Sequence, residues 1–402
     1  MALMDNNPDT ARIEISVQRF IGWLDKNGSQ TFDPYDLMTT RYASFARKIY
    51  FKNALLGLPF VFPIVFADMI FPGMRKILVH KKRYAIVEAH LAMGFMNMYR
   101  HTGNPEYIDQ AAALCKNLDT IKIEGYHGPC WGYPFDWQSS SGFWQAGTPF
   151  VTVTPYCFEA FLELYKITQN EKHLKYALDI ARFAFHDLNE TITGPDAAAC
   201  SYSPLDNSRV INASAYRSCM LLYAHQYNGD DQYRVKALQG LNFIAQNQNA
   251  DGSWFYAADD AHNKFIDNFH TCFVLKNLIK CNKLLQSSSL AETIANGLAF
   301  YRKAFINKDF SLKPFVKSNK FNLVNESLYD YAEAINLAQM AEPLFPEFQT
   351  ANDQIIHMAL GWQRSDGSFI NQKSIFGIRS GRSYLRWGIA PLFHSLTIRL
   401  NT

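Results

Sequence analysis

Apolar residues recur with the spacing of an amphipathic helix in six long segments spread over the whole chain. The segments begin near residues 83, 154, 212, 268, 325 and 383, and each has a polar capping or turn residue near its start. Successive starts are 71, 58, 56, 57 and 58 residues apart, so only the first interval departs from a common length. This regularity predicts an internal repeat.

A second, more amphipathic helix alternates with these segments, beginning near residues 11, 105, 171, 230, 290 and 351. Short polar turns such as HTGNPEYIDQA (101–111) lead into the second helices. Stretches rich in Gly and aromatic residues lead out of them and are expected to be short hairpins or extended loops. The alternation predicts an all-α fold, an (α/α)6 toroid of six helical hairpins. Its aromatic loops would gather at one mouth, where the inner helices begin.

We expect a single domain over residues 1–402, with an apolar and basic insertion at about 37–80 that lengthens the first repeat. Residues 54–67 carry no charge and have basic residues on both sides. The run is too short to span a bilayer, and Pro59, Pro63 and Pro72 are expected to break a helix. A buried loop closing one end of the domain is the favoured interpretation. Peripheral membrane contact through 54–73 is the alternative.

Composition excludes several classes of protein. The chain is 48% hydrophobic, which excludes a disordered chain, and its net charge of +3 argues against a nucleic-acid partner. Seven cysteines without CxxC spacing and an acidic N-terminus without a signal-peptide pattern favour the cytoplasm. Association with the inner face of the membrane stays open, as does the oligomeric state.

Aromatic residues make up 15% of the chain, and a small group of them falls in the predicted mouth loops. Trp and Tyr rings offer flat apolar faces to pyranose C–H groups, although rings that simply plug the mouth would show the same pattern. The candidate substrate-binding residues in these loops are His127, Trp131, Tyr133, Trp137, Trp254 and Tyr256.

Several motifs resemble those of known toroid families. QNADGSW (248–254) and QRSDGSF (363–369) resemble the QW-type repeats of terpenoid cyclases and prenyltransferases. The polar turns resemble those of six-hairpin glycosidases, polysaccharide lyases and uronyl epimerases. FIDNFHTCFVL (265–275) and WGYPFDW (131–137) resemble segments of uncharacterised proteins from bacterial surface-polysaccharide biosynthesis loci. The resemblance covers nearly the full length and implies the toroid, which hosts many chemistries.

The residues disfavour isoprenoid chemistry. The closest match to an acidic DxDD cluster, at 257–260, lacks its first Asp. Asp267, His270 and Cys272 are the residue types of a prenyltransferase zinc site, but positions i, i+3 and i+5 do not share one helix face tightly. We expect neither a metal nor another cofactor, because no nucleotide-binding or strong metal-ligand motif is found.

Six residues are candidates for acid–base catalysis. Asp136 lies in the first aromatic loop and Asp260 in a later one, while Asp267 or Asn268 is the expected cap of the fourth inner helix. His270 falls in the first turn of that helix and is a candidate general base. Glu326 and Tyr329 are expected to share one face at the start of the fifth inner helix, a pairing suited to proton transfer beside a uronate carboxyl group.

Three arginines surround the start of the last inner helix. Arg382 and Arg386 are four residues apart and are expected to share a face, with Arg379 just before them. Guanidinium groups near a helix start suit bidentate binding of a carboxylate or phosphate, and salt bridges to nearby loops are the alternative.

The favoured function is a carbohydrate-active protein that acts on an acidic polysaccharide or oligosaccharide in surface-glycan biosynthesis. The chemistry would be that of a uronate epimerase, a lyase or a glycoside hydrolase, and the last requires two facing carboxylates about 5–9.5 Å apart. Two alternatives stay open: a non-catalytic component of glycan assembly at the membrane and, less favoured, an isoprenoid-binding or terpenoid-cyclase-like protein.

Overall fold

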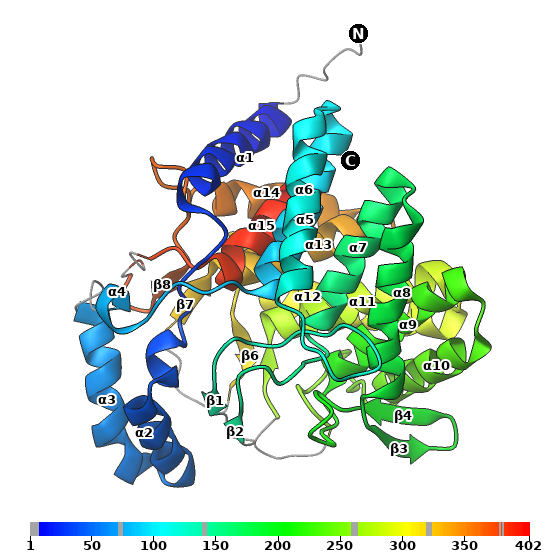
Figure 1. Ribbon diagram of the computed structural model, residues 1–402, viewed down its shortest axis with the longest axis horizontal. Coiled ribbons are helices and arrows are strands. Elements are labelled where there is room, and N and C mark those ends of the chain that lie inside the picture. The colour runs from blue at the N-terminus through cyan, green and yellow to red at the C-terminus, as the bar shows by residue number, and fades with distance from the viewer. Residues whose placement is uncertain are drawn as a thin grey trace.

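Twelve helices of the described residues pair into six hairpins around a central axis. The computed structural model describes residues 8–70, 75–138, 143–258, 264–318, 324–377, 379 and 382–402. Consecutive inner helices contact one another, and the last returns to the first, so the ring is closed (Figure 1). The inner helices are α5 (Ala85–Thr102), α7 (Thr154–Thr168), α9 (Ile211–Asn228), α11 (Asn268–Leu285), α13 (Leu328–Ala341) and α15 (Ala390–Arg399). The predicted (α/α)6 toroid is confirmed.

The outer helices cover this ring and show the amphipathic pattern that their position requires. In α8 the buried residues are spaced along one face, whereas in α5 every residue from Ala85 to Met98 is buried. The outer helices are α1 (Pro8–Asn27), α6 (Pro105–Thr120), α8 (Glu171–His186), α10 (Asp231–Gln246), α12 (Ser288–Phe305) and α14 (Glu347–Leu360).

The repeated turn between inner and outer helices has a simple physical basis. Helices α5 and α9 end at Gly103 and Gly229, whose φ angles of 71° and 69° are left-handed. The next helices start at capping side chains: Asn104 accepts from the N–H of Glu106, and Asp230 from that of Gln232. The chain therefore reverses direction at the same point of successive repeats.

Short antiparallel strand pairs form the opposite end, where the inner helices begin. β1 (Trp137–Gln138) pairs with β2 (Phe143–Trp144), and β3 (Glu190–Gly194) pairs with β4 (Ala197–Cys200). The next two pairs join loops of successive repeats: β5 (Ile266–Asp267) with β6 (Phe315–Lys317), and β7 (Val324–Ser327) with β8 (Gln372–Ser374). These pairs tie neighbouring loops into one rim, as predicted for the mouth.

The insertion is helical rather than a buried loop. After a 3-10 turn, η1 (Asp36–Thr39), helices α2 (Arg41–Lys52) and α3 (Ala54–Ile70) form a hairpin that extends from the ring, followed by α4 (Arg75–Leu78) (Figure 1). The expectation that prolines would break α3 is wrong at Pro59 and Pro63. Both are exposed, so the carbonyl groups left without an N–H partner can reach water. Pro72 lies outside the described residues.

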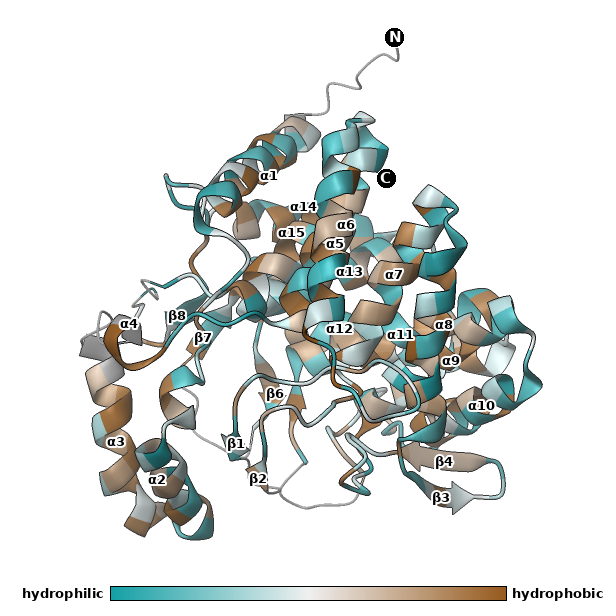
Figure 2. Ribbon diagram, viewed as in Figure 1, coloured by the Kyte–Doolittle hydropathy of each residue, from teal (hydrophilic) through white to brown (hydrophobic). Residues whose placement is uncertain are grey.

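The expectation that 54–67 is buried is also wrong, because most side chains of α3 are exposed. Figure 2 shows that the helix is apolar along its length. Among the described helices, none combines the length and the hydrophobicity needed to cross a membrane.

Candidate functional site

A belt of aromatic side chains, which we call the collar, surrounds the mouth of the ring. The rings come from loops and from the first turns of inner helices, and each lies within about 6 Å, centroid to centroid, of another ring of the belt. The collar consists of Tyr35, Tyr133, Phe150, Tyr202, Tyr256, Phe269, His270, Tyr329 and Trp387.

One arc of the collar is formed by the starts of α11 and α13. The ring of His270 lies 4.7 Å from Tyr256 and 4.3 Å from Phe269. Phe269 in turn lies 5.2 Å from Tyr329, and Tyr329 lies 5.4 Å from Trp387. His270, Phe269, Tyr256 and Trp387 are only partly buried, so the belt presents ring surface rather than closing completely.

The second arc continues from Tyr256 to Tyr133. The hydroxyl groups of Tyr202 and Tyr256 lie close enough to influence each other's pKa. The ring of Phe150 lies 5.3 Å from that of Tyr202 and 5.4 Å from that of Tyr133, centroid to centroid. Burial raises the pKa of all three tyrosines of this arc, so their hydroxyl groups stay protonated at neutral pH and can donate hydrogen bonds.

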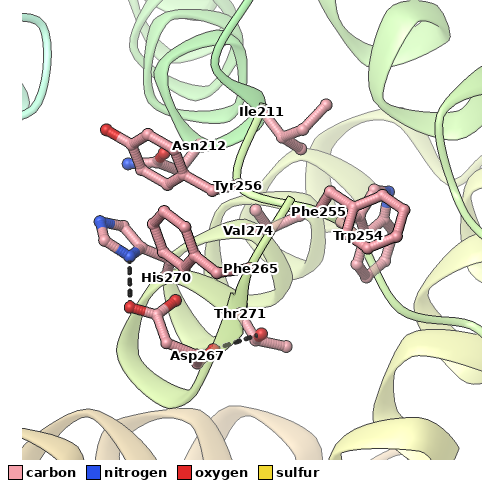
Figure 3. A pocket seen from close by; sticks show the side chains of 10 residues that line it. All are labelled: Ile211, Asn212, Trp254, Phe255, Tyr256, Phe265, Asp267, His270, Thr271 and Val274. Atoms are coloured by element: carbon pink, nitrogen blue, oxygen red, sulfur yellow. Dashed lines mark hydrogen bonds and ion pairs between the residues drawn. The ribbon is translucent and has the colours of Figure 1, made fainter. Parts of the chain in front are cut away.

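His270 and Asp267 form a hydrogen-bonded pair within the collar. Asp267 ends β5 and His270 follows in the first turn of α11, where Nδ1 lies 2.7 Å from the Oδ2 atom of Asp267. Asp267 occupies the N-cap position, but its side chain makes no capping bond and is committed to the histidine. The Asp267 side chain is 3% exposed and that of His270 21%. The pair thus fixes one ring nitrogen, and the other nitrogen points away from Asp267 (Figure 3).

A small pocket opens beside this pair, with room for about one water molecule. Figure 3 shows Asn212 beside the ring of Tyr256 and on the same side as the free nitrogen of His270. Asn212 is 2% exposed, and neither its amide nitrogen nor its amide oxygen has a hydrogen-bond partner among the described residues. A buried amide without partners is costly, which is typical of a group reserved for a ligand.

Sequence reasoning missed Asn212 as a site residue. It lies in the first turn of α9, as His270 lies in the first turn of α11. The available signal was a large polar side chain in the first turn of a helix that is otherwise apolar nearly all round.

A second carboxyl group lies behind the pair. Asp330 of α13 is 2% exposed, and its Oδ1 atom has no hydrogen-bond partner in the part of the chain that the structure describes. Burial, together with the nearby charges of Asp267 and Glu333, raises the pKa of Asp330 well above its usual range. Burial therefore disfavours the charged form of Asp330.

Glu326 and Tyr329 do not share a helix face as expected. Pairing with β8 keeps Glu326 extended in β7, and α13 begins only at Leu328. Glu326 instead accepts hydrogen bonds from the Tyr331 hydroxyl, at 2.7 Å, and from Lys373 Nζ, at 2.8 Å. Tyr329 belongs to the collar, where burial raises its pKa well above the usual range.

Two of the candidate platform residues lie in the core rather than at the surface of the mouth. Trp131 is 1% exposed and donates its indole N–H to the carbonyl of Leu118 at 2.9 Å. Trp254 is 4% exposed and donates in the same way to Ile244 at 2.9 Å, although part of its ring lines the small pocket. Each indole therefore anchors its loop to the end of the preceding outer helix.

The remaining candidates of the first aromatic loop are dispersed. His127 is exposed and pairs with Asp187 at 2.7 Å, beside the end of α8. Asp136 is exposed and accepts the N–H of Ala146 at 2.8 Å, which fixes the loop around β1 and β2. Trp137 packs against the collar, 6.1 Å from Tyr133. Asp260 lies outside the described residues.

The arginines do not form the expected cluster on one helix face. Residues 382–384 precede the helical turns, and Trp387 and Gly388 have non-helical dihedral angles, so Arg382 and Arg386 are not four residues apart on a helix. Arg382 donates to the Tyr384 hydroxyl at 3.1 Å, and Arg379 is exposed.

Arg386 is buried in a two-point ion pair with Asp33. Burial alone would lower the pKa of Arg386, but the Asp33 carboxylate outweighs burial and raises it. The guanidinium also lies 5.0 Å from the ring centre of Tyr133 and 4.9 Å from that of Trp387. It therefore links these two rings and completes the collar. The described residues hold no group of three or more His, Cys, Asp or Glu side chains arranged for a metal ion.

Comparisons with known proteins identify the fold. No protein-family model and no curated protein sequence matches the chain. Among solved structures, cellobiose 2-epimerase from Bacillus thermoamylovorans is similar, with a TM-score of 0.63 and 14% identity over 80% of this chain and 90% of that one.

Two further structures carry the same fold. Unsaturated glucuronyl hydrolase from Bacillus sp. GL1 gives a TM-score of 0.62 at 13% identity, over 96% of this chain and 95% of that one. A GH76 α-mannanase from Bacteroides thetaiotaomicron gives 0.62 at 13%, over 79% and 86%. At these identities the likeness establishes the (α/α)6 toroid architecture.

Proposed function

We propose that the protein is a carbohydrate-active enzyme in which His270 transfers a proton at a sugar carbon, in the manner of an epimerase. The single observation that carries the proposal is the His270–Asp267 pair, set in an aromatic collar with the second ring nitrogen of a partly exposed His270 pointing away from Asp267. A histidine fixed at one nitrogen by a carboxylate can accept and return a proton at the other.

The proposed step moves one proton and one electron pair. Nε2 of His270 removes the proton from the carbon next to the carbonyl of an open-chain sugar, and the C–H electron pair shifts to the carbonyl oxygen to give an enolate. Asp267 stabilises the resulting imidazolium, while the amide of Asn212 and the hydroxyl of Tyr256 can donate to sugar oxygens. The imidazolium then exchanges its proton with water, and the open-chain intermediate turns its other face to Nε2 of His270. Nε2 donates its proton to the same carbon from that face as the electron pair returns from oxygen to carbon, which restores the carbonyl group, leaves His270 neutral and inverts the centre.

The described carboxyl groups around His270 favour this chemistry over glycoside hydrolysis. Asp267 is the one carboxylate among the residues that line the small pocket, and that carboxylate is hydrogen-bonded to His270. Hydrolysis needs two carboxyl groups that face each other across the sugar, whereas Asp330 is buried behind the pair.

The similar structures support a sugar substrate: they include cellobiose and sugar epimerases, α-mannanases and an unsaturated glucuronyl hydrolase. We extend the proposal to an acidic oligosaccharide of surface-glycan biosynthesis in the cytoplasm. The glucuronyl hydrolase likeness over 96% of the chain supports the acidic sugar of this extension. Arg386 does not support it, because Asp33 already neutralises its charge.

A non-catalytic role in glycan assembly at a membrane is the second candidate function. The exposed apolar helix α3 favours it, because such a surface suits attachment. A protein that serves only as an anchor would need neither the His270–Asp267 pair nor an unsatisfied Asn212.

A panel of disaccharides tests the proposal. The purified chain is incubated with cellobiose, mannobiose and a glucuronate-containing disaccharide, and the products are separated by chromatography and weighed by mass spectrometry. Epimerisation gives a new disaccharide of unchanged mass, whereas hydrolysis gives monosaccharides. His270→Asn should abolish conversion, and His173→Asn, a substitution on α8 at the opposite end of the ring, should not. Cleavage as the main reaction, or full activity of His270→Asn, would refute the epimerase proposal.

A further inference from the structure

The hairpin of α2 and α3, residues 41–70, which we call the arm, leaves an apolar helix uncovered. Among the described helices and strands, α3 makes substantial contact only with α2. Seven of its large apolar side chains are between 40% and 85% exposed. These are Leu55, Leu56, Leu58, Phe60, Phe62, Val65 and Phe66. A helix that is apolar nearly all round is normally buried in protein or in lipid, and α3 is not buried in the toroid.

Positive charge is concentrated around this helix. Between residues 41 and 83 lie nine of the chain's 39 Lys and Arg residues but one of its 36 Asp and Glu residues. This segment therefore carries a net charge of +8, and the remainder of the chain carries −5. Arg41, Lys48 and Lys52 of α2 are all exposed.

The charge decides which occupant fits the uncovered helix. A second copy of the chain packed on α3 would bring two segments of +8 together, which is unfavourable. An anionic lipid surface offers both an apolar interior for the exposed side chains and negative headgroups for the surrounding cations. With 17 residues α3 is about 25 Å long, a length suited to lying in the interface.

We propose that the arm docks the protein on an anionic bilayer surface, with α3 inserted at the headgroup boundary and the basic residues of α2 against the headgroups. The arm is also attached to the mouth. Helix α2 contacts β1, and Arg47 lies 5.8 Å from the ring centre of Tyr35 in the collar. Figure 1 shows the arm and β1 on the same side of the ring, so docking brings the mouth close to the lipid.

Co-sedimentation of the full chain with vesicles tests this proposal. One set of vesicles contains phosphatidylcholine alone, and the other adds about 30% phosphatidylglycerol to supply negative charge. The protein should bind the anionic vesicles, bind the neutral ones at least about tenfold more weakly, and leave the anionic ones as salt is added.

Paired variants separate the two contributions. Leu55→Ser with Phe62→Ser should lower binding to the anionic vesicles at least about tenfold, as should Lys48→Glu with Lys52→Glu. All four side chains are exposed, so folding should be preserved. The matched controls are Ile192→Ser with Leu205→Ser, and Lys172→Glu with Lys175→Glu; these replace exposed residues away from the arm and should bind like the natural protein.

Three results would overturn the proposal. The first is no sedimentation of the natural protein with anionic vesicles. The second is equal loss of binding in the arm variants and the controls. The third combines two observations. The natural protein is a dimer in sedimentation velocity, and the double variant Leu55→Ser with Phe62→Ser dissociates that dimer but binds lipid as the natural protein does. None of these results depends on the sugar chemistry proposed for the mouth.

Discussion

The buried ion pair between Asp33 and Arg386 predicts a large loss of stability when one partner is removed. Asp33 has no exposed surface, and Arg386 is 8% exposed. The guanidinium donates to both carboxylate oxygens, with Nη2 of Arg386 2.8 Å from Oδ1 of Asp33. Asp33→Ala would leave a buried cation without its counter-charge, which costs about 3–5 kcal/mol.

The thermal midpoint gives a direct measure of this cost. At about 2.1 cal/mol/K of unfolding entropy per residue, a chain of 402 residues should lose roughly 4–6 °C in its unfolding midpoint. Differential scanning calorimetry of Asp33→Ala, followed by near-ultraviolet circular dichroism of the collar aromatics, provides the assay. The double variant Asp33→Leu with Arg386→Met should recover much of the loss, because it removes both charges.

The reasoning about this pair is refuted by either of two results. A midpoint change of less than about 1 °C for Asp33→Ala would show that the cation is not desolvated. A double variant less stable than Asp33→Ala would show that shape, rather than the unpaired charge, determines the cost.

Three further predictions follow from other buried groups. Trp131→Phe leaves the Leu118 carbonyl without its indole donor and should destabilise the fold by about 1–3 kcal/mol in urea denaturation; an unchanged midpoint would contradict the anchoring role. Gly388→Ala places a Cβ 2.6 Å from the Tyr329 nitrogen at a φ of 105° and should cost about 2 kcal/mol or more, whereas a silent substitution would contradict the described turn. Because the folded-state pKa of Asp330 is raised, its contribution to stability is present at acid pH and is lost as pH rises through that pKa. Asp330→Asn should therefore raise the thermal midpoint above that of the natural protein by more at pH 8 than at pH 4. Equal changes at both pH values would contradict the raised pKa of Asp330.

The toroid could be predicted because its cause is repeated in the sequence. Inner helices must be apolar nearly all round and outer helices on one face, so both patterns recur at a nearly constant interval. The turns repeat as well, through left-handed residues such as Gly103 and caps such as Asn104. These determinants are local, and they can be recognised without knowledge of tertiary contacts.

The site could be predicted only where its determinants are local. Asp267 and His270 are three residues apart at a helix start, and their pairing follows from that spacing. Asn212 reaches the same pocket from another repeat, so no spacing reveals it. The partner of Arg386 is Asp33, 353 residues away, and a guanidinium available for a ligand cannot be distinguished in sequence from one already paired.

Exposure was the other quantity that the sequence did not determine. Trp131 was expected at the mouth because it lies in an aromatic loop, yet its ring lies against the end of α6. The run 54–67 was expected to be buried because it is apolar, yet it forms an uncovered helix. In both cases burial depends on what packs against the segment from a distant part of the chain.

Deuterium incorporation tests the central claim most directly. With an active disaccharide in D2O, the natural protein should introduce one deuteron at the carbon next to the carbonyl of the product, seen as loss of that proton signal by nuclear magnetic resonance. His270→Asn should lower the rate at least about a hundredfold, and Asp267→Asn about tenfold to a hundredfold. The control His173→Asn should match the natural protein. A product without deuterium, or unchanged exchange in His270→Asn, would contradict proton transfer by the His270–Asp267 pair.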